Sequence, residues 1–153
     1  MRTFFLALIA LLAGAVGASA QCLSGYSPRA VADALVAKGY RAQVESLEDG
    51  QPVIRLGMQG NDVNVYLYDC DSGEPCTGLT LRVGFDLDQG MSYEQINQWN
   101  YDNRLSRAFL DKDMDPFLEA DMTFTGGVGH ENLMTTFADF EDSLGRFKTF
   151  VGW

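Results

Sequence analysis

The amino-acid sequence predicts one α+β domain, an antiparallel sheet with packed helices, in the order α-β-β-β-β-α-β-β-α. Two observations carry this prediction. Runs of alternating apolar and polar residues, separated by turn residues, predict strands between residues 40 and 85 and again between 107 and 122. Apolar residues at helical spacing precede, interrupt and follow these runs. The sequence contains no internal repeat or long linker that would divide the domain.

The first twenty residues have the pattern of an export signal. Arg2 supplies the positive end, residues 4–13 form the apolar segment, and residues 18–20 form a small-residue cleavage site. A membrane-spanning helix would need a run of about 20 apolar residues, which is longer than this segment. We therefore expect a signal peptide at 1–20 and a single mature domain at 21–153, which would be periplasmic or secreted.

The composition of the mature chain limits its partners. Removing the leader leaves 133 of the 153 residues, enough for one hydrophobic core. The full chain has 11 Lys and Arg against 21 Asp and Glu, a net charge of −10, and loss of Arg2 makes it −11. A surface this acidic repels phosphate backbones, so we expect no nucleic-acid partner. No second apolar span follows the leader, so we expect no membrane association after cleavage.

In an exported protein, three cysteines can form one disulfide and leave one cysteine over. Cys70 and Cys76 flank the turn-rich residues 71–75, and a hairpin there would bring their Cα atoms within bridging distance. We expect a disulfide between them. A metal site built on these two cysteines is the alternative, but the sequence offers no second pair of His or Cys at zinc spacing. Cys22 is left as a free thiol or an intermolecular partner in a segment expected to fray. Lipid attachment at Cys22 is disfavoured because Gln21 is not a small residue.

The first half of the domain is predicted to be one helix and a meander of strands. Ser27 and Pro28 are typical of a helix N-cap and first helical residue, and Gly39 ends the helix. The four strands that follow are predicted at 40–47, 53–58, 63–68 and 79–85. Their apolar residues alternate with polar ones, which favours an antiparallel sheet with one face in water.

The second half begins with a well-specified helix start. Ser92 is a favourable N-cap, and Gln95 stands three residues later as its capping-box partner. The periodicity then changes to two at 107–110, a turn follows at 111–116, and a strand is predicted at 117–122. This stretch predicts a helix followed by a hairpin.

A final helix is predicted after the glycine-rich break at 126–129, beginning at His130 or Glu131. Its apolar positions follow one face at helical spacing: Leu133, Phe137, Phe140, Leu144, Phe147 and Val151. We interpret this stripe as the side that lies across the sheet and closes the core. A seam for a partner helix or a homodimer is the alternative. Residues 151–153 are expected to pack back onto this cover.

Three motifs that suggest chemistry are each incomplete. Residues 111–115 place carboxylates at alternate positions, as in a calcium loop, but Pro116 and Met122 stand where glycine and glutamate are required. His130 is the only histidine, and no nucleophile-elbow motif accompanies it. Glu119 and Asp121 share one strand face, where two carboxylates could act as an acid–base pair. We interpret them instead as the outward-facing polar residues of an alternating strand. We predict no catalytic residue, no metal site and no cofactor.

The polar residues of the second helix form one further candidate group. Asn97, Asn100 and Asn103 recur every three residues, which is typical of an exposed polar helix face. Alternatively, Trp99, Asn100 and Arg104 form a network that orients this helix against neighbouring strands or receives a partner.

A resemblance to a known family rests on these same segments. Residues 96–100 (INQWN), 107–111 (RAFLD), 119–121 (EAD) and 126–128 (GGV) resemble the YbjN family of bacterial sensory transduction regulators. The resemblance extends over nearly all of the mature chain. It implies a fold similar to that of type III secretion chaperones, and a role in binding or regulation without known catalysis.

Together these observations predict a non-enzymatic, chaperone-like binding or regulatory module of the periplasm. We expect it to recognise a protein or peptide partner through its sheet or its terminal helix, with homodimerisation as an open alternative. The alternative function is a domain that binds calcium or a small ligand through its acidic loops.

Overall fold

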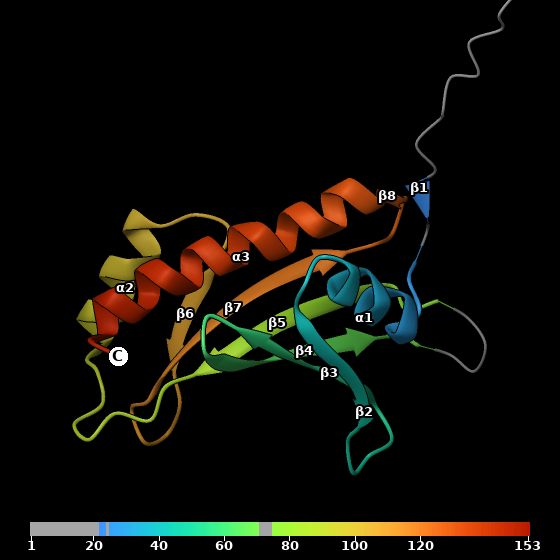
Figure 1. Ribbon diagram of the computed structural model, residues 1–153. Coiled ribbons are helices and arrows are strands. Elements are labelled where there is room, and N and C mark those ends of the chain that lie inside the picture. The colour runs from blue at the N-terminus through green and yellow to red at the C-terminus, as the bar shows by residue number, and fades with distance from the viewer. Residues whose placement is uncertain (1–21, 24, 71–74) are drawn as a thin grey trace, which may run out of the picture.

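The computed structural model describes residues 22–23, 25–70 and 75–153, so the predicted signal peptide at 1–20 lies outside the described residues (Figure 1). Its helices are α1 (Pro28–Ala37), α2 (Tyr93–Asp102) and α3 (His130–Val151). The main strands are β2 (Arg41–Ser46), β3 (Pro52–Met58), β4 (Asn61–Tyr68), β5 (Gly78–Gly84), β6 (Arg107–Leu110) and β7 (Pro116–Thr123). The predicted α+β class and the predicted order of these elements are confirmed.

The six main strands form one antiparallel sheet in the order β2-β3-β4-β5-β7-β6. β2 to β5 are a meander in which each strand pairs with its neighbour in sequence. β7 pairs with β5 on one side and with β6 on the other. The two edges of the sheet are therefore β2 and β6.

The hydrophobic core lies between one face of this sheet and the helices. α3 crosses the sheet, α1 covers its β2–β3 side, and α2 lies beside β6 (Figure 1). The apolar stripe of α3 is buried at Leu133, Phe137, Phe140, Leu144 and Phe147. This confirms the interpretation of α3 as the cover of the core. The stripe is not available as a seam for a partner helix.

The helix ends follow the predicted capping. The Ser27 side chain accepts a hydrogen bond from the Ala30 N–H, with Pro28 as the first helical residue. Ser92 and Gln95 form both bonds of the capping box. After α3 ends, the Trp153 ring packs edge-on against Phe85, which follows β5, with 5.3 Å between centroids; the contact expected for the last residues was with the covering helix.

Two short strands were missed by the sequence prediction. β1 (Cys22–Leu23) pairs with β8 (Val128–Gly129), which lies directly before α3. The segment at Cys22 was expected to fray, and this expectation is wrong. Residues 126–129 were expected to break the sheet, and the six-stranded sheet does end before them, at Thr123. Gly126 and Gly127 have positive φ and turn the chain so that Val128 lies opposite Leu23 in a separate two-stranded sheet.

Within the described residues, no helix has the length and hydropathy needed to cross a membrane.

Candidate functional site

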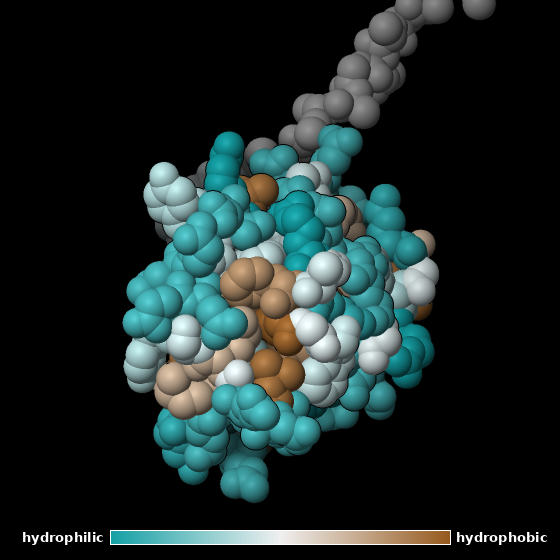
Figure 2. Space-filling model, turned by 90° about the vertical axis from the view of Figure 1, so that its left-hand side faces the viewer, coloured by the Kyte–Doolittle hydropathy of each residue, from teal (hydrophilic) through white to brown (hydrophobic). Residues whose placement is uncertain are grey.

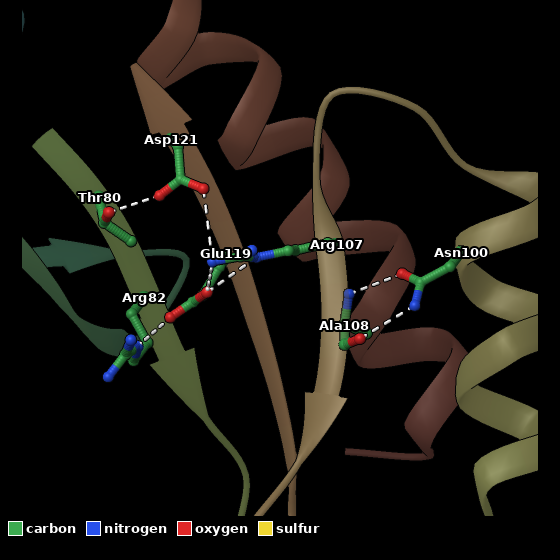
Figure 3. Close-up of polar contacts among 7 residues, drawn as sticks. All are labelled: Thr80, Arg82, Asn100, Arg107, Ala108, Glu119 and Asp121. Atoms are coloured by element: carbon green, nitrogen blue, oxygen red, sulfur yellow. Dashed lines mark hydrogen bonds and ion pairs between the residues drawn. The ribbon is translucent and has the colours of Figure 1, made fainter. Parts of the chain in front are cut away.

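The face of the sheet opposite the core carries a cluster of charged side chains. The strand register places Glu119 of β7 between Arg82 of β5 and Arg107 of β6. Thr80 and Asp121 form the next pair along β5 and β7. Figure 3 shows that these side chains converge on Glu119 and Asp121. We call these five residues the polar cluster.

Glu119 is the buried centre of the polar cluster, with 1% of its surface exposed. One of its carboxylate oxygens accepts a hydrogen bond from Arg82 Nε, and the other accepts from Arg107 Nη2 at 2.6 Å and Nε at 3.0 Å. Arg107 Nη2 also lies 3.4 Å from Asp121. The hydrogen bonds from Arg107 to Glu119, and the negative charge of Glu119, raise the pKa of the Arg107 guanidinium.

The contacts of the polar cluster leave little capacity for chemistry. Both oxygens of Glu119 are occupied, and Asp121 accepts a hydrogen bond from the Thr80 hydroxyl. The Arg82 guanidinium also lies over the rings of Tyr66 and Phe109, at 5.2 Å and 5.6 Å from their centroids. Such saturated ion pairs and ring contacts join neighbouring strands. We therefore interpret the polar cluster as a support that holds β5, β7 and β6 in register.

Asn100 covers the outer edge of β6. Its side-chain Nδ2 donates to the Ala108 carbonyl oxygen at 3.0 Å, and its Oδ1 accepts from the Ala108 N–H at 2.7 Å (Figure 3). These are the two bonds that a neighbouring strand would make with Ala108. The amide side chain of α2 thus occupies the place of a further strand, which protects this edge from pairing with another chain.

The opposite edge, β2, has no such cover. Leu47 N–H donates to the Gln51 carbonyl at 2.9 Å, and hydrogen-bonded pairs alternate along an antiparallel ladder. The backbone groups of Ala42, Val44 and Ser46 therefore point away from β3. Within the described part of the chain, no other segment pairs with this side of β2. Val36 of α1 is exposed beside it and lines a shallow depression together with Ala42.

The comparisons with known proteins agree with this architecture. Residues 27–153 match the family model described as "YbjN: Putative bacterial sensory transduction regulator". The chain belongs to the YbjN family. The resemblance predicted from residues 96–128 is thereby confirmed. The search of curated proteins finds no match to this YbjN chain.

Among solved structures, the YbjN chain is similar to the Yersinia pestis type III secretion chaperone SycH, which was crystallised in complex with a stable fragment of YscM2. The match covers 76% of this chain and 96% of that chain, with 14% sequence identity and a TM-score of 0.50. At this identity the likeness shows the fold. The predicted similarity to type III secretion chaperones is confirmed at that level.

The three residues predicted as a network in α2 are separated in the YbjN chain. Trp99 is buried and its ring contacts Phe147 at 4.8 Å, whereas Asn100 faces β6. Arg104 is exposed and lines a different surface depression together with Arg146. Trp99 and Asn100 both fix α2, but through separate contacts, and Arg104 takes no part in either.

The Cys70 and Cys76 sulfur atoms are bonded, with 4.1 Å between Cα atoms. Cys76 is fully buried, and its backbone exchanges two hydrogen bonds with Tyr26, at 3.1 Å and 3.4 Å. The predicted pairing therefore has a local structural role in this YbjN chain. The disulfide braces the connection between β4 and β5, and the Tyr26–Cys76 backbone bonds attach the residues before α1 to it.

The acidic turn after β6 uses its carboxylates internally. Asp111 Oδ1 accepts from the backbone N–H groups of Asp113 and Asp115, at 2.9 Å and 3.0 Å. Asp115 Oδ1 accepts from the Leu87 N–H at 2.9 Å. In the ranges that the structure describes, no three residues of the types His, Cys, Asp or Glu are placed to hold a metal ion. His130 is exposed at the first position of α3 in this YbjN chain.

The sequence interpretation of the polar face missed Arg82 and Arg107. Glu119 and Asp121 were treated as outward polar residues, and only Asp121 is exposed. The signal that would have found the two arginines is the pairing of β7 with β5 and β6, and the sequence of this YbjN chain contains no local mark of that pairing.

Proposed function

We propose that this protein is a non-enzymatic, chaperone-like module that binds an extended segment of a protein partner by strand addition at the outer edge of β2. The observation that carries the proposal is the difference between the two sheet edges. Asn100 occupies the outward backbone groups of Ala108 in β6, whereas no other segment of the described residues pairs with the outward groups of β2. Strand addition binds peptides through these main-chain groups.

The surroundings of β2 suit a partner strand with mixed side chains. Val44 and Val36 are exposed, at 36% and 53%, and offer apolar contacts on the helix side. On the other side of β2, Arg41 is exposed and Glu45 forms an exposed ion pair with Arg55 of β3 at 3.0 Å. Alternate side chains of an added strand would meet these two different surfaces, which is how such sites obtain specificity.

Support for a protein partner also comes from the comparisons. The structurally similar SycH is a secretion chaperone seen with a fragment of another protein, and the family is described as regulatory. We place the module in the periplasm because residues 1–20 have the pattern of a cleaved export signal. Partner binding in that compartment would supply the regulatory role.

The test uses the mature chain as bait in periplasmic extract, with two variants at one position. Val44→Pro removes an outward N–H that β3 does not use, so the sheet itself should form normally. Val44→Thr keeps this N–H and is the matched control. We expect a protein that wild type and Val44→Thr retain and that Val44→Pro loses by about tenfold, because a missing bond and the proline ring both oppose pairing.

Hydrogen exchange then locates the contact. Binding of the retained partner should slow exchange of the amides of Ala42, Val44 and Ser46 and leave the Ala108 amide unchanged. Equal retention of the same proteins by all three baits, or a complex in which the β2 amides exchange at the free rate, would count against strand addition.

A further inference from the structure

A patch of apolar side chains lies on the side of the molecule that carries α2 and the end of α3. Figure 2 shows hydrophobic residues at the centre of this face with hydrophilic residues around them. Phe150, in the last turn of α3, and Trp153, just after its end, are exposed aromatic residues, at 38% and 56%. Val151 lies between them in the sequence, Leu87 follows the Trp153 contact Phe85 by two positions, and both are half-buried. We call Phe150 and Trp153, with these two neighbours, the aromatic patch.

The aromatic patch is held in place by the core beneath it. The Phe150 ring lies 5.4 Å from that of Trp99 and 6.2 Å from that of Phe147. The Trp153 ring packs on Phe85. Aromatic side chains fixed in this way lose little conformational entropy on binding, which is a property of residues that dominate interface energies.

The segments against which the aromatic patch packs carry exposed carboxylates. Asp86 directly follows Phe85, on which Trp153 packs, and Asp88 lies in the same loop. Glu94 is in the first turn of α2, whose Trp99 supports Phe150. All three are exposed, and none has a side-chain partner among the described residues. We call these three residues the acidic rim.

We infer that the aromatic patch and its acidic rim together bind a protein segment that presents apolar side chains flanked by lysine or arginine. Apolar contacts to Phe150 and Trp153 would supply affinity, and basic residues would pair with Asp86, Asp88 and Glu94. A two-fold pairing of this surface with a second copy would bring the two acidic rims against each other, and like charges oppose such a contact.

This surface is separate from the site of the proposed function. α2 lies beside β6, at the opposite edge of the sheet from β2 (Figure 1). Binding at the aromatic patch and strand addition at β2 can therefore be tested independently. A partner long enough to reach both would meet an extended-strand site at one edge and a site for an amphipathic segment at the other.

The probe is a fluorescein-labelled synthetic helical peptide of about four turns, with leucine and tryptophan along one face and lysine elsewhere. The control peptide has glutamate in place of each lysine and the same apolar residues. Fluorescence anisotropy with the mature protein should show binding of the lysine peptide, weakened by salt, and no binding of the glutamate peptide.

Protein variants separate the two parts of the surface. The triple variant Asp86→Asn, Asp88→Asn, Glu94→Gln keeps the aromatic patch and should weaken binding about tenfold with loss of most of the salt dependence. Trp153→Ala should weaken it about tenfold at every salt concentration. Tyr101→Ala, a change at an 87% exposed aromatic residue of α2, is the matched control and should leave the affinity unchanged.

The Val44→Pro variant distinguishes this site from the β2 edge and should bind the lysine peptide as wild type does. Equal affinity for the two peptides, wild-type affinity in the acidic-rim variant, or the same loss in Tyr101→Ala as in Trp153→Ala would each overturn the inference.

Discussion

Arg82 and Arg107 approach Glu119 from opposite sides, and each donates to a different oxygen of its carboxylate. The two arginines are more exposed than the acid between them, at 37% and 62% of the side chain against 2%. Water can therefore solvate either arginine if Glu119 is lost. Glu119 is shielded from water and depends on the two arginines to compensate its charge. This difference in exposure predicts that removing both arginines costs more stability than the sum of the two single removals.

Single substitution of either arginine should be mild, and double substitution should not. Arg82→Ala or Arg107→Ala alone leaves Glu119 one partner and is expected to cost about 1 kcal/mol. The double variant leaves a buried carboxylate unpaired and is expected to cost about 3–5 kcal/mol. Urea unfolding of the four proteins measures the coupling. Strictly additive costs would show that Glu119 reaches solvent without its arginines.

Asn100→Ala should weaken the contact between α2 and the sheet and expose the β6 edge. Ala108 loses both side-chain bonds, so we expect a decrease of about 1–3 kcal/mol in the free energy of unfolding. We also expect self-association at high concentration, measured by light scattering, because an unpaired edge recruits other chains. Asn97→Ala, at an exposed position of the same helix, is the control. A monomer as stable as wild type would refute the role given to Asn100.

Leu105 combines an exposed side chain, at 64%, with a left-handed backbone at φ 66°. This conformation costs a non-glycine residue about 1–2 kcal/mol, so Leu105→Gly should stabilise the protein by about 0.5–1 kcal/mol after the entropy of glycine is counted. Leu105→Ala keeps the strain and should match wild type. Thermal unfolding compares the three, and a gain in the alanine variant alone would indicate removal of exposed apolar surface instead.

The stability contributed by Tyr40 should depend on pH. Burial, followed by the hydrogen bond to Glu141 and the negative charge of Glu141, together raise the pKa of Tyr40 from 10.0 to about 12. The folded state thus holds this proton more tightly than the unfolded state. The contribution is present below pH 10.0 and is lost as the pH rises to about 12.

Urea unfolding of wild type and Tyr40→Phe across this range tests the prediction, since the other tyrosines are common to both. The free-energy difference between the two should fall with rising pH. Glu141→Gln removes one negative charge and should make the fall smaller. A difference that stays constant across the range would contradict the assigned contact.

Removal of the disulfide should cost a moderate amount of stability. A loop this short contributes about 2 kcal/mol on the chain-entropy model. The variant Cys70→Ala, Cys76→Ala should therefore unfold at lower urea than wild type, and a reducing agent should destabilise wild type without affecting the variant. Equal stability of reduced and oxidised wild type would mean that the Tyr26–Cys76 backbone bonds alone hold this region.

Local signals in the sequence predicted most of the fold. The capping residues Ser27 and Ser92 located two helix starts, and the stripe from Leu133 to Val151 identified the cover of the core. These features depend on residues within one or two turns of each other, so periodicity and capping rules detect them.

The candidate sites depend on contacts between distant residues and were not predictable in this way. Glu119 meets Arg82 only because β7 lies beside β5, and the two are 37 positions apart. Asn100 was singled out, but its bonds to Ala108 require α2 to lie against β6. The β1–β8 pair joins residues more than one hundred positions apart. Register between distant strands leaves no mark in a short window of sequence.

The position of β7 between β5 and β6 also has a consequence for the order of folding. β2 to β5 can pair as soon as each hairpin closes, because their contacts are local. β5 obtains its second neighbour only when residues 116–123 return across α2 and β6. Until then the unfinished sheet presents β5 as a second unpaired edge. A chain that folds progressively from its N-terminus would thus pass through a stage in which β5, as well as β2, can accept another strand, until β7 covers β5.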